Sequence, residues 1–262
     1  MKANKLAAFI VTTYIGFIST AHASAQQPVF SPEQEARIGE IAADYLVSHP
    51  EILVTVSKNL QEQQQARKQK MSALSVMENQ ASLLHDPDTP AVGPENAEVA
   101  VIEFFDYQCV FCSRFAPELE KVMKAHPDVR YLFKEWPIFG GRWEASLQAA
   151  HQGLTVWQKK GPQAYVTYHN AIYATGHNEG NLTADDIHGA ALKAGLATPA
   201  PGEHTATLEK NSNLAEVLGL TGTPGIIVMP VSGATMDNIT VFPEAVTVER
   251  LQAVIRKAPR VK

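Results

Sequence analysis

The sequence predicts an α/β domain that contains a long helical insertion and follows an N-terminal helical arm. Three observations support this class. Residues 98–134 have the pattern strand, helix, strand; residues 143–218 are mainly helical between strands; and residues 31–84 are helical before the first strand. A chain of 262 residues is long enough for one such core with an attached module.

Residues 1–23 have the features of a secretory signal. Two lysines precede a mainly apolar segment, residues 6–18, and Ala21-His22-Ala23 forms an A-x-A cleavage site. The apolar segment is shorter than the about 20 residues that a membrane span needs, so we expect cleavage near Ala23, or after Ala25, and not an anchor. Export would place the mature protein in an oxidising compartment, the periplasm.

The charge of the chain argues against some partners. Removal of Lys2 and Lys5 with the signal changes the formal net charge from −5 to −7. The sequence has no basic patch that would favour binding to nucleic acid or to an anionic membrane surface, so we expect neither as a partner.

Residues 24–85 are expected to form the helical arm. Ser31 starts the first helix as N-cap, with Pro32 at the first helical position and Gln34 completing a capping box. After the break at residues 48–50, a second helix runs over residues 52–84. If continuous, this second helix would be about 50 Å long.

The arm cannot bury its apolar stripe alone. Its helices either fold back onto the α/β domain or pack against the same segment of another chain. Residues 61–70 are almost wholly polar, as expected for a solvated stalk between modules, which favours self-association through residues 31–60. We expect a homodimer; the sequence leaves a homotrimer open. Residues 86–97, with three prolines and a glycine, are expected to be a linker.

The α/β domain is expected to be discontinuous. Its first part, residues 98–140, contains a right-handed β-α-β unit with parallel strands. Residues 141–218 form the helical insertion. The second part, residues 219–262, contains two short strands and a closing amphipathic helix.

The segment Cys109-Val110-Phe111-Cys112 contains the only two cysteines of the chain. Cys109 lies at the junction between the first strand and the N-terminus of the following helix. Backbone N–H groups and the helix dipole favour its thiolate there, and a thiolate is the species that attacks a disulfide. Cys112 lies one turn further on and can close a disulfide ring. This context predicts a redox-active pair.

Other uses of a C-x-x-C segment fit less well. Attachment of a c-type haem needs a histidine where this chain has Ser113. A structural zinc site needs four ligands, and the sequence offers no second cysteine pair. A purely structural disulfide would close too short a loop to stabilise much. A plain pair of free thiols stays open.

Three features of the chain resemble a known family. They are Glu103-Phe104-Phe105 ahead of the cysteines, the strand Tyr131–Glu135, and the loop Gly222-Thr223-Pro224. Together they resemble the thioredoxin superfamily, and within it DsbA-like enzymes that carry a helical domain inserted into the thioredoxin fold. The preceding arm resembles the oligomeric ScsC-type branch, and by analogy DsbC and DsbG.

The resemblance implies roles for the cysteines and for the loop opposite them. Cys109 would be the nucleophile, and Cys112 would resolve the mixed disulfide. Thr223 and Pro224 would bind substrate, with Pro224 in the cis form. Threonine before this proline occurs in isomerase-like members.

The resemblance also implies roles for four further residues. Val110 and Phe111 would tune the thiolate and contact substrate; Phe111 stands where many DsbA enzymes have a histidine, so a less extreme pKa and a less oxidising potential are expected. Glu103 would be a buried acid beneath the cysteines. Lys134, on the next strand, would be its partner and would help it move protons.

The function expected from these residues is formation and isomerisation of disulfides in exported proteins. Its partners would be unfolded or misoxidised clients, together with a DsbB-like oxidant or a DsbD-like reductant. No cofactor and no metal are expected. The alternative is a periplasmic chaperone or a Cu(I)-binding protein of the ScsC type. The sequence does not fix the balance of oxidase and isomerase activity.

Overall fold

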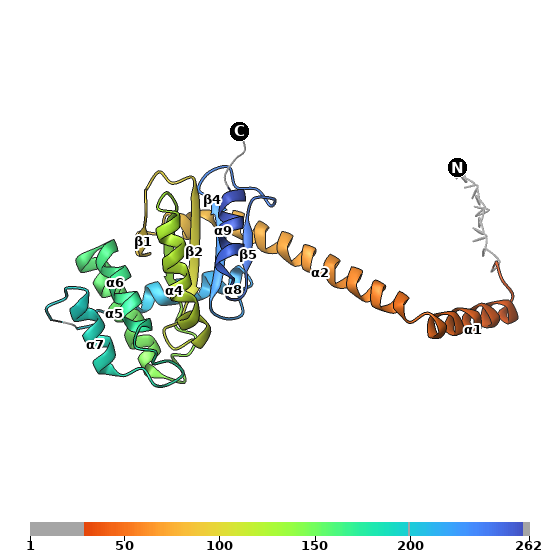
Figure 1. The fold of residues 1–262 in the computed structure, drawn as a ribbon, viewed down its shortest axis with the longest axis horizontal. Helices are drawn as coiled ribbons and strands as arrows, with labels where there is room; N and C mark the ends of the chain where they lie inside the picture. Colours follow the sequence, from red (N-terminus) through yellow and green to blue (C-terminus); the bar gives the residue numbers. More distant parts are fainter. Residues whose placement is uncertain (1–28, 199, 259–262) are drawn as a thin grey trace, which may run out of the picture. The chain divides into compact units, whose positions relative to one another are not determined.

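The computed structural model describes residues 29–198 and 200–258, so the expected signal peptide, residues 1–23, lies outside the described residues. The chain divides into two compact units, Met1–Asn59 and Leu60–Lys262 (Figure 1). Within the described ranges, no helix is both long and apolar enough to cross a membrane.

The first unit contains helix α1, Pro32–Ser48, and the start of α2, Glu51–Glu78. The predicted capping box is confirmed. The backbone N–H of Gln34 donates to Ser31 Oγ at 3.3 Å, and the N–H of Ser31 donates to Gln34 Oε1 at 2.8 Å. Helix α1 buries none of its residues within the described chain.

Helix α2 has 28 residues and is therefore about 42 Å long. It ends at Glu78, so the predicted continuous helix over residues 52–84 is interrupted. Asn79 Nδ2 donates to Ser75 O at 2.9 Å, a local bond of the kind that competes with helix continuation. The short helix α3, Gln80–Leu84, follows and buries Leu83 and Leu84.

The second unit is built on a five-stranded sheet of order β1-β3-β2-β4-β5. The strands are β1 Ala91–Val92, β2 Val99–Phe105, β3 Arg130–Glu135, β4 Gly225–Pro230 and β5 Thr240–Phe242. Strands β2 and β3 are parallel and joined by helix α4, Val110–Ala125, which confirms the predicted β-α-β unit. Strands β4 and β5 continue the sheet in antiparallel pairing.

The segment expected as a linker, residues 86–97, contains the edge strand β1. Ala91 and Val92 pair with β3 in antiparallel register. Gly93 then turns the chain at φ +98°, where an added Cβ would lie 2.2 Å from the carbonyl oxygen of Val129. Prolines and a glycine therefore shape a tight packed edge here, and the segment is part of the second unit.

Helices cover both faces of the sheet. Because strand side chains alternate, Val101, Phe105 and Phe133 face one side, and Ile102, Phe104 and Leu132 face the other. The first side packs against α4 and the closing helix α9, Val248–Lys257. The second side packs against the end of α2, against α3 and against α8, Thr205–Val217.

The predicted helical insertion is present. Helices α5, Glu144–Lys160, α6, Pro162–Tyr173, and α7, Ala184–Lys193, pack on one another (Figure 1). The following helix, α8, differs from the prediction because its residues Leu214 and Ala215 pack against the sheet. The insertion therefore ends before α8.

Candidate active site

The loop that leads into the cysteines is held by Asp106. Its Oδ1 accepts the backbone N–H of Gln108 at 2.7 Å, a local turn that presents Cys109. Its Oδ2 accepts the N–H of Phe139 and the hydroxyl of Ser146, both at 2.8 Å. One buried carboxylate thus joins the end of β2 to the start of the helical insertion.

Cys109 is the N-cap of α4, as the sequence predicts. Its Sγ accepts the backbone N–H of Cys112 at 3.4 Å and, in the protonated thiol form, donates to the carbonyl oxygen of Thr223 at 3.2 Å. Both cysteines are buried thiols. Hydrogen bonding from the Cys112 side chain outweighs the opposing effect of burial and lowers the pKa of Cys109 from 9.0 to about 6. Cys109 is therefore largely thiolate at neutral pH.

Cys112 has the opposite character. Burial raises the pKa of this thiol well above its ordinary value, and its hydrogen bond to Cys109 acts in the same direction. The pair therefore consists of one thiolate and one thiol, in the order that attack by Cys109 and later resolution by Cys112 require.

The loop at Gly222-Thr223-Pro224 lies against Cys109, and the peptide bond between Thr223 and Pro224 is cis, as expected. The hydroxyl of Thr223 is buried and has no hydrogen-bond partner among the residues that the structure describes. The Thr223 side chain lies close enough to Cys109 to contribute to the lowered pKa of that thiol.

Val110 and Phe111 open the first turn of α4 beside Cys109. Phe111 is 56% exposed although it is large and apolar, and the guanidinium of Arg114 lies 6.0 Å from its ring centre. An exposed aromatic ring next to the nucleophile suits contact with a client, so the substrate-binding role of Val110 and Phe111 stays a prediction that the geometry permits.

Glu103 is buried on β2, on the sheet face that packs against α4. Burial raises the pKa of this carboxyl from 4.5 to about 8, and the charge of Cys109 raises it further toward that value. Its Oε2 has no hydrogen-bond partner within the described part of the chain. Glu103 is thus a neutral acid that is electrostatically coupled to Cys109 at neutral pH.

We expect Glu103→Gln to change the pH dependence of stability. The folded state binds more protons than the unfolded state between pH 4.5 and about 8, so the free energy of unfolding falls as the pH rises through this window. The variant should lack this fall, so its stability relative to the wild type should increase by about 5 kcal/mol from below pH 4.5 to near pH 9. Urea unfolding across the pH range measures it. Glu98→Gln, on an exposed side chain, is the control; equal pH slopes in wild type and Glu103→Gln would contradict the assignment.

The predicted pair of Glu103 with Lys134 is wrong. In the parallel ladder Glu103 is opposite Phe133, and Lys134 is opposite Phe104, so the acid and the lysine point to opposite faces of the sheet. Lys134 Nζ instead donates to Asp86 Oδ2 at 3.2 Å, to Ser82 O at 2.9 Å and to Thr89 Oγ1. Lys134 therefore anchors the segment before β1 and does not reach the cysteines.

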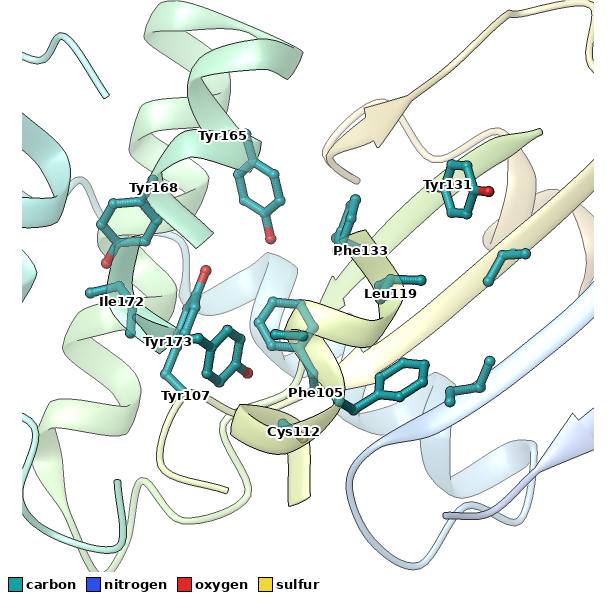
Figure 2. Close-up of a cluster of buried hydrophobic side chains, with 14 of the residues drawn as sticks. Phe105, Tyr107, Cys112, Leu119, Tyr131, Phe133, Tyr165, Tyr168, Ile172 and Tyr173 are labelled. Carbon is teal, nitrogen blue, oxygen red and sulfur yellow. The ribbon is translucent and has the colours of Figure 1, made fainter. Parts of the chain in front are cut away.

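A second buried acid, Glu135, lies on the same sheet face as Glu103. Its Oε1 accepts the hydroxyls of Tyr107 at 3.0 Å and of Tyr165 at 2.7 Å, and burial raises its pKa well above the ordinary value. Figure 2 shows the tyrosines of α6 gathered with Phe105 and Tyr107 beside Cys112. The site thus borders an aromatic cluster contributed by the helical insertion.

Sequence reasoning missed Asp106 and Glu135. Asp106 had a usable signal, because an aspartate directly after a strand often closes a turn with the residue two positions on. Glu135 ends an apolar strand, where a charged residue is usually solvated, so only the packed insertion reveals its burial.

No group of three or more histidine, cysteine, aspartate or glutamate side chains that could hold a metal ion occurs among residues 29–198 and 200–258.

Comparison with known proteins agrees with this geometry. The family model described as Thioredoxin matches residues 85–257 of the 262. The chain belongs to the thioredoxin family. A second model, described as the copper resistance protein ScsC N-terminal domain, matches residues 34–67 of this thioredoxin-family chain.

Solved structures extend this similarity over most of the chain. BcfH of Salmonella enterica Typhimurium is 38% identical, with a TM-score of 0.74, over 86% of this chain and 96% of that one. Proteus mirabilis ScsC in a transitional conformation is 27% identical, with a TM-score of 0.60, over 88% and 97%. A periplasmic thioredoxin-like protein from Salmonella enterica serovar Typhimurium is 31% identical, with a TM-score of 0.58, over 68% and 94%.

The curated relatives resemble this chain over only a part of their own length. The Na(+)/H(+) antiporter NhaA 1 of Salinispora arenicola (strain CNS-205) is 26% identical over 169 residues, 62% of this chain. NhaA 3 of Salinispora tropica (strain ATCC BAA-916 / DSM 44818 / JCM 13857 / NBRC 105044 / CNB-440) is 33% identical over 54 residues, 20% of this chain. The chain spans 25% and 8% of their lengths, so the similarity concerns a segment of each antiporter.

Proposed function

We propose that this protein exchanges thiols and disulfides in exported client proteins of the periplasm. The observation that supports this most is the environment of Cys109, whose Sγ lies at the N-terminus of α4 and against the carbonyl of Thr223. The lowered pKa, about 6, gives the nucleophile in its reactive form. The similarity to a periplasmic thioredoxin-like protein supports the compartment.

The proposed exchange runs in two steps. The Cys109 thiolate attacks one sulfur of a client disulfide, that S–S bond breaks, and the other client sulfur leaves as a thiolate. Cys112 then loses its proton and attacks Cys109, which forms the Cys109–Cys112 disulfide and releases the client reduced by two electrons. Glu103, once deprotonated, is the buried base beneath the pair that takes this proton. The reverse sequence donates a disulfide.

Two residues favour isomerase character within this chemistry. The side chain of Phe111 supplies no hydrogen bond or positive charge beside the thiolate, in contrast to a histidine at this position, and only its backbone helps to lower the pKa of Cys109. Thr223 precedes the cis proline with a hydroxyl that can bond a client backbone. Clients would be unfolded or misoxidised exported proteins, with a DsbD-like reductant or a DsbB-like oxidant resetting the pair.

The test combines two measurements on the full chain. Exchange with a small disulfide should be detectable and should follow the deprotonation of Cys109, with a midpoint near pH 6. Thiol trapping in cells then reports the resting state: mostly reduced cysteines support an isomerase, and mostly oxidised cysteines an oxidase. Absence of exchange with any disulfide would overturn the proposal.

We further propose that the first unit joins copies of the chain through residues 31–60. Ile38, Ile41 and Tyr45 share one face of α1, and each is about half exposed in the single chain. Leu53 and Val56 add to the exposed apolar surface on α2. A continuous exposed apolar face of this kind is typical of a surface that contacts another protein.

Ile41→Glu is expected to weaken self-association by at least about tenfold, because it places a charge where an apolar side chain worth about 2 kcal/mol would be buried. Light scattering over a concentration series measures the mass. Ala43→Glu, on the opposite side of α1, is the matched control. A wild-type chain that stays monomeric, or equal effects of the two substitutions, would refute self-association through this face.

A second candidate function is Cu(I) binding or a chaperone role. It is favoured by the match of residues 34–67 to the copper resistance protein ScsC and by two neighbouring thiols, which are soft ligands that select Cu(I). The double variant Cys109→Ser/Cys112→Ser would separate the candidates. Retained suppression of client aggregation supports a chaperone role, and loss of Cu(I) binding supports a Cu(I)-binding role for the two thiols.

A further inference from the structure

A turn of the helical insertion lies against the segment that carries the nucleophile. The turn covers residues 176–181, between α6 and α7. The backbone N–H of Glu179 donates to the carbonyl oxygen of Gln108 at 3.0 Å, and the N–H of Gly180 donates to Gln108 Oε1 at 2.7 Å. Gln108 is fully buried and directly precedes Cys109, so two hydrogen bonds fix the turn beside the active site.

The turn is also held by its neighbours in the insertion. At the end of α6, the hydroxyl of Tyr173 donates to the carbonyl oxygen of Asp106 at 3.1 Å. Gly180 has φ +97°, and an added Cβ there would lie 2.7 Å from Nε1 of Trp143. The turn is therefore packed between the loop that leads into Cys109 and the start of α5.

Glu179 has an unfavourable backbone conformation. Its φ is +50°, and it is the one residue other than glycine with a positive φ in the described ranges, residues 29–198 and 200–258. An L side chain is disfavoured in this region, where glycine or asparagine is more usual. The side chain of Glu179 is exposed, so packing in the core does not account for a glutamate here. Strain of this kind is concentrated at functional sites, which points to a role for the carboxylate.

The charge of this carboxylate lies within electrostatic range of Cys109. The carbonyl of Gln108 belongs to the peptide bond that leads into Cys109, so the hydrogen bond of 3.0 Å holds the Cα atoms of Glu179 and Cys109 within about 7 Å of each other. At low ionic strength the Debye length is about 30 Å, so the carboxylate acts on a molecule at Cys109 whatever rotamer the glutamate adopts. His177, the one basic residue of the turn, does not neutralise it, because its Nδ1 lies 2.8 Å from Asp186 Oδ2.

We propose that Glu179 is a specificity-determining residue that selects client disulfides flanked by basic residues. Its charge attracts a lysine or arginine next to the client disulfide and repels an acidic residue there. The rate at which the Cys109 thiolate attacks therefore depends on the charge around the client disulfide. The proposal rests on the proposed function, because it names the class of client for that same site.

Two exposed arginines carry the opposite charge nearby. The guanidinium of Arg114 lies 6.0 Å from the ring centre of Phe111, and that of Arg142 lies 4.5 Å from the ring centre of Trp143. The charge preference of the wild type is the balance of all these groups. The contribution of Glu179 is therefore measured as the change on its substitution.

The test compares three small disulfides: cystamine, which is cationic, glutathione disulfide, which is anionic, and hydroxyethyl disulfide, which is neutral. The rate of attack by the reduced full chain is measured well above the Cys109 pKa of about 6, and each rate is normalised to that of the neutral disulfide. We expect Glu179→Gln to lower the ratio of the cystamine rate to the glutathione disulfide rate by at least about threefold at low salt. The change should disappear at about 0.5 M salt, where the charges are screened.

Further variants separate the charge of Glu179 from the conformation of its turn. Glu179→Asp keeps the carboxylate and should keep the ratio. Glu179→Gly should lower the ratio as Glu179→Gln does, although glycine suits a φ of +50°. Glu209→Gln is the matched control, because it removes the same charge from an exposed position on α8, which packs on the sheet face opposite α4.

The outcomes distinguish this proposal from the proposed function. Equal ratios in wild type and Glu179→Gln, or an equal change in Glu209→Gln, would overturn charge selection by Glu179 even where exchange is normal. A lower ratio in Glu179→Gln but not in Glu179→Gly would trace the effect to the conformation of the turn and would equally overturn it. Failure of the wild type to attack any of the three disulfides would overturn the proposed function, and this inference with it.

Discussion

Cys109→Ser is expected to reduce exchange with a client disulfide by at least about a thousandfold, equivalent to about 4 kcal/mol of activation free energy. Serine keeps the size of the side chain and its place at the N-cap of α4, but its hydroxyl is not ionised at neutral pH and does not attack a disulfide. The rate of exchange with a small disulfide, followed by absorbance, measures the loss.

Cys112→Ser is the matched variant on the neighbouring turn. It keeps the nucleophile and removes only the thiol that resolves the intermediate, so mixed disulfides with clients should accumulate through Cys109 and be visible on non-reducing gels. Equal activity of Cys109→Ser and wild type, or trapping through position 112 in Cys109→Ser, would contradict the assignment of the two roles.

Lys134→Met is expected to lower the free energy of unfolding by about 3–5 kcal/mol, the usual cost of removing one partner of a buried ion pair. Lys134 and Asp86 both have fully buried side chains. Burial disfavours the charged form of both side chains and lowers the pKa of Lys134. Hydrogen bonding and charge from Lys210 and Lys134 nevertheless hold the pKa of Asp86 below its ordinary value. Without Lys134, the backbone carbonyl of Ser82 and the hydroxyl of Thr89 also lose their donor. Urea unfolding measures the change.

Lys210→Met is the control for this variant, because Lys210 also pairs with Asp86, at 2.8 Å, but its side chain is about half exposed. Its loss should cost no more than about 1 kcal/mol. The double variant Lys134→Met/Asp86→Asn should recover part of the stability by removing a buried charge that only the half-exposed Lys210 would still neutralise. A Lys134→Met chain as stable as Lys210→Met would refute the anchoring role, and a loss of exchange activity without loss of stability would return Lys134 to the active site.

Much of the secondary structure in both units could be predicted from local signals. The apolar run of β2, the helical spacing after the cysteines and the capping box at Ser31 each depend on residues a few positions apart, and each formed as expected. The cis peptide before Pro224 was expected from the resemblance of its loop. Local patterns also placed Cys109 at a helix N-terminus, which accounts for much of its chemistry.

Features that depend on register or on distant packing were not accessible in this way. Glu103 and Lys134 are on neighbouring strands, but a one-position difference in register places them on opposite faces. Strand β1 is too short to have a period, and its prolines and glycine resemble those of a linker. The burial of Glu135 depends on tyrosines that come from an insertion later in the chain.

The carboxylate of Asp106 has a consequence for how this sequence can diverge. One oxygen sets the turn before Cys109, and the other accepts the backbone N–H of Phe139, just before the insertion, and the hydroxyl of Ser146 in its first helix. A substitution that displaces the insertion by a fraction of an ångström is therefore transmitted to the nucleophile through a single side chain. Substitutions that accumulate in the helical insertion can in this way change the reactivity of the Cys109 thiol while every residue around the sulfur stays the same.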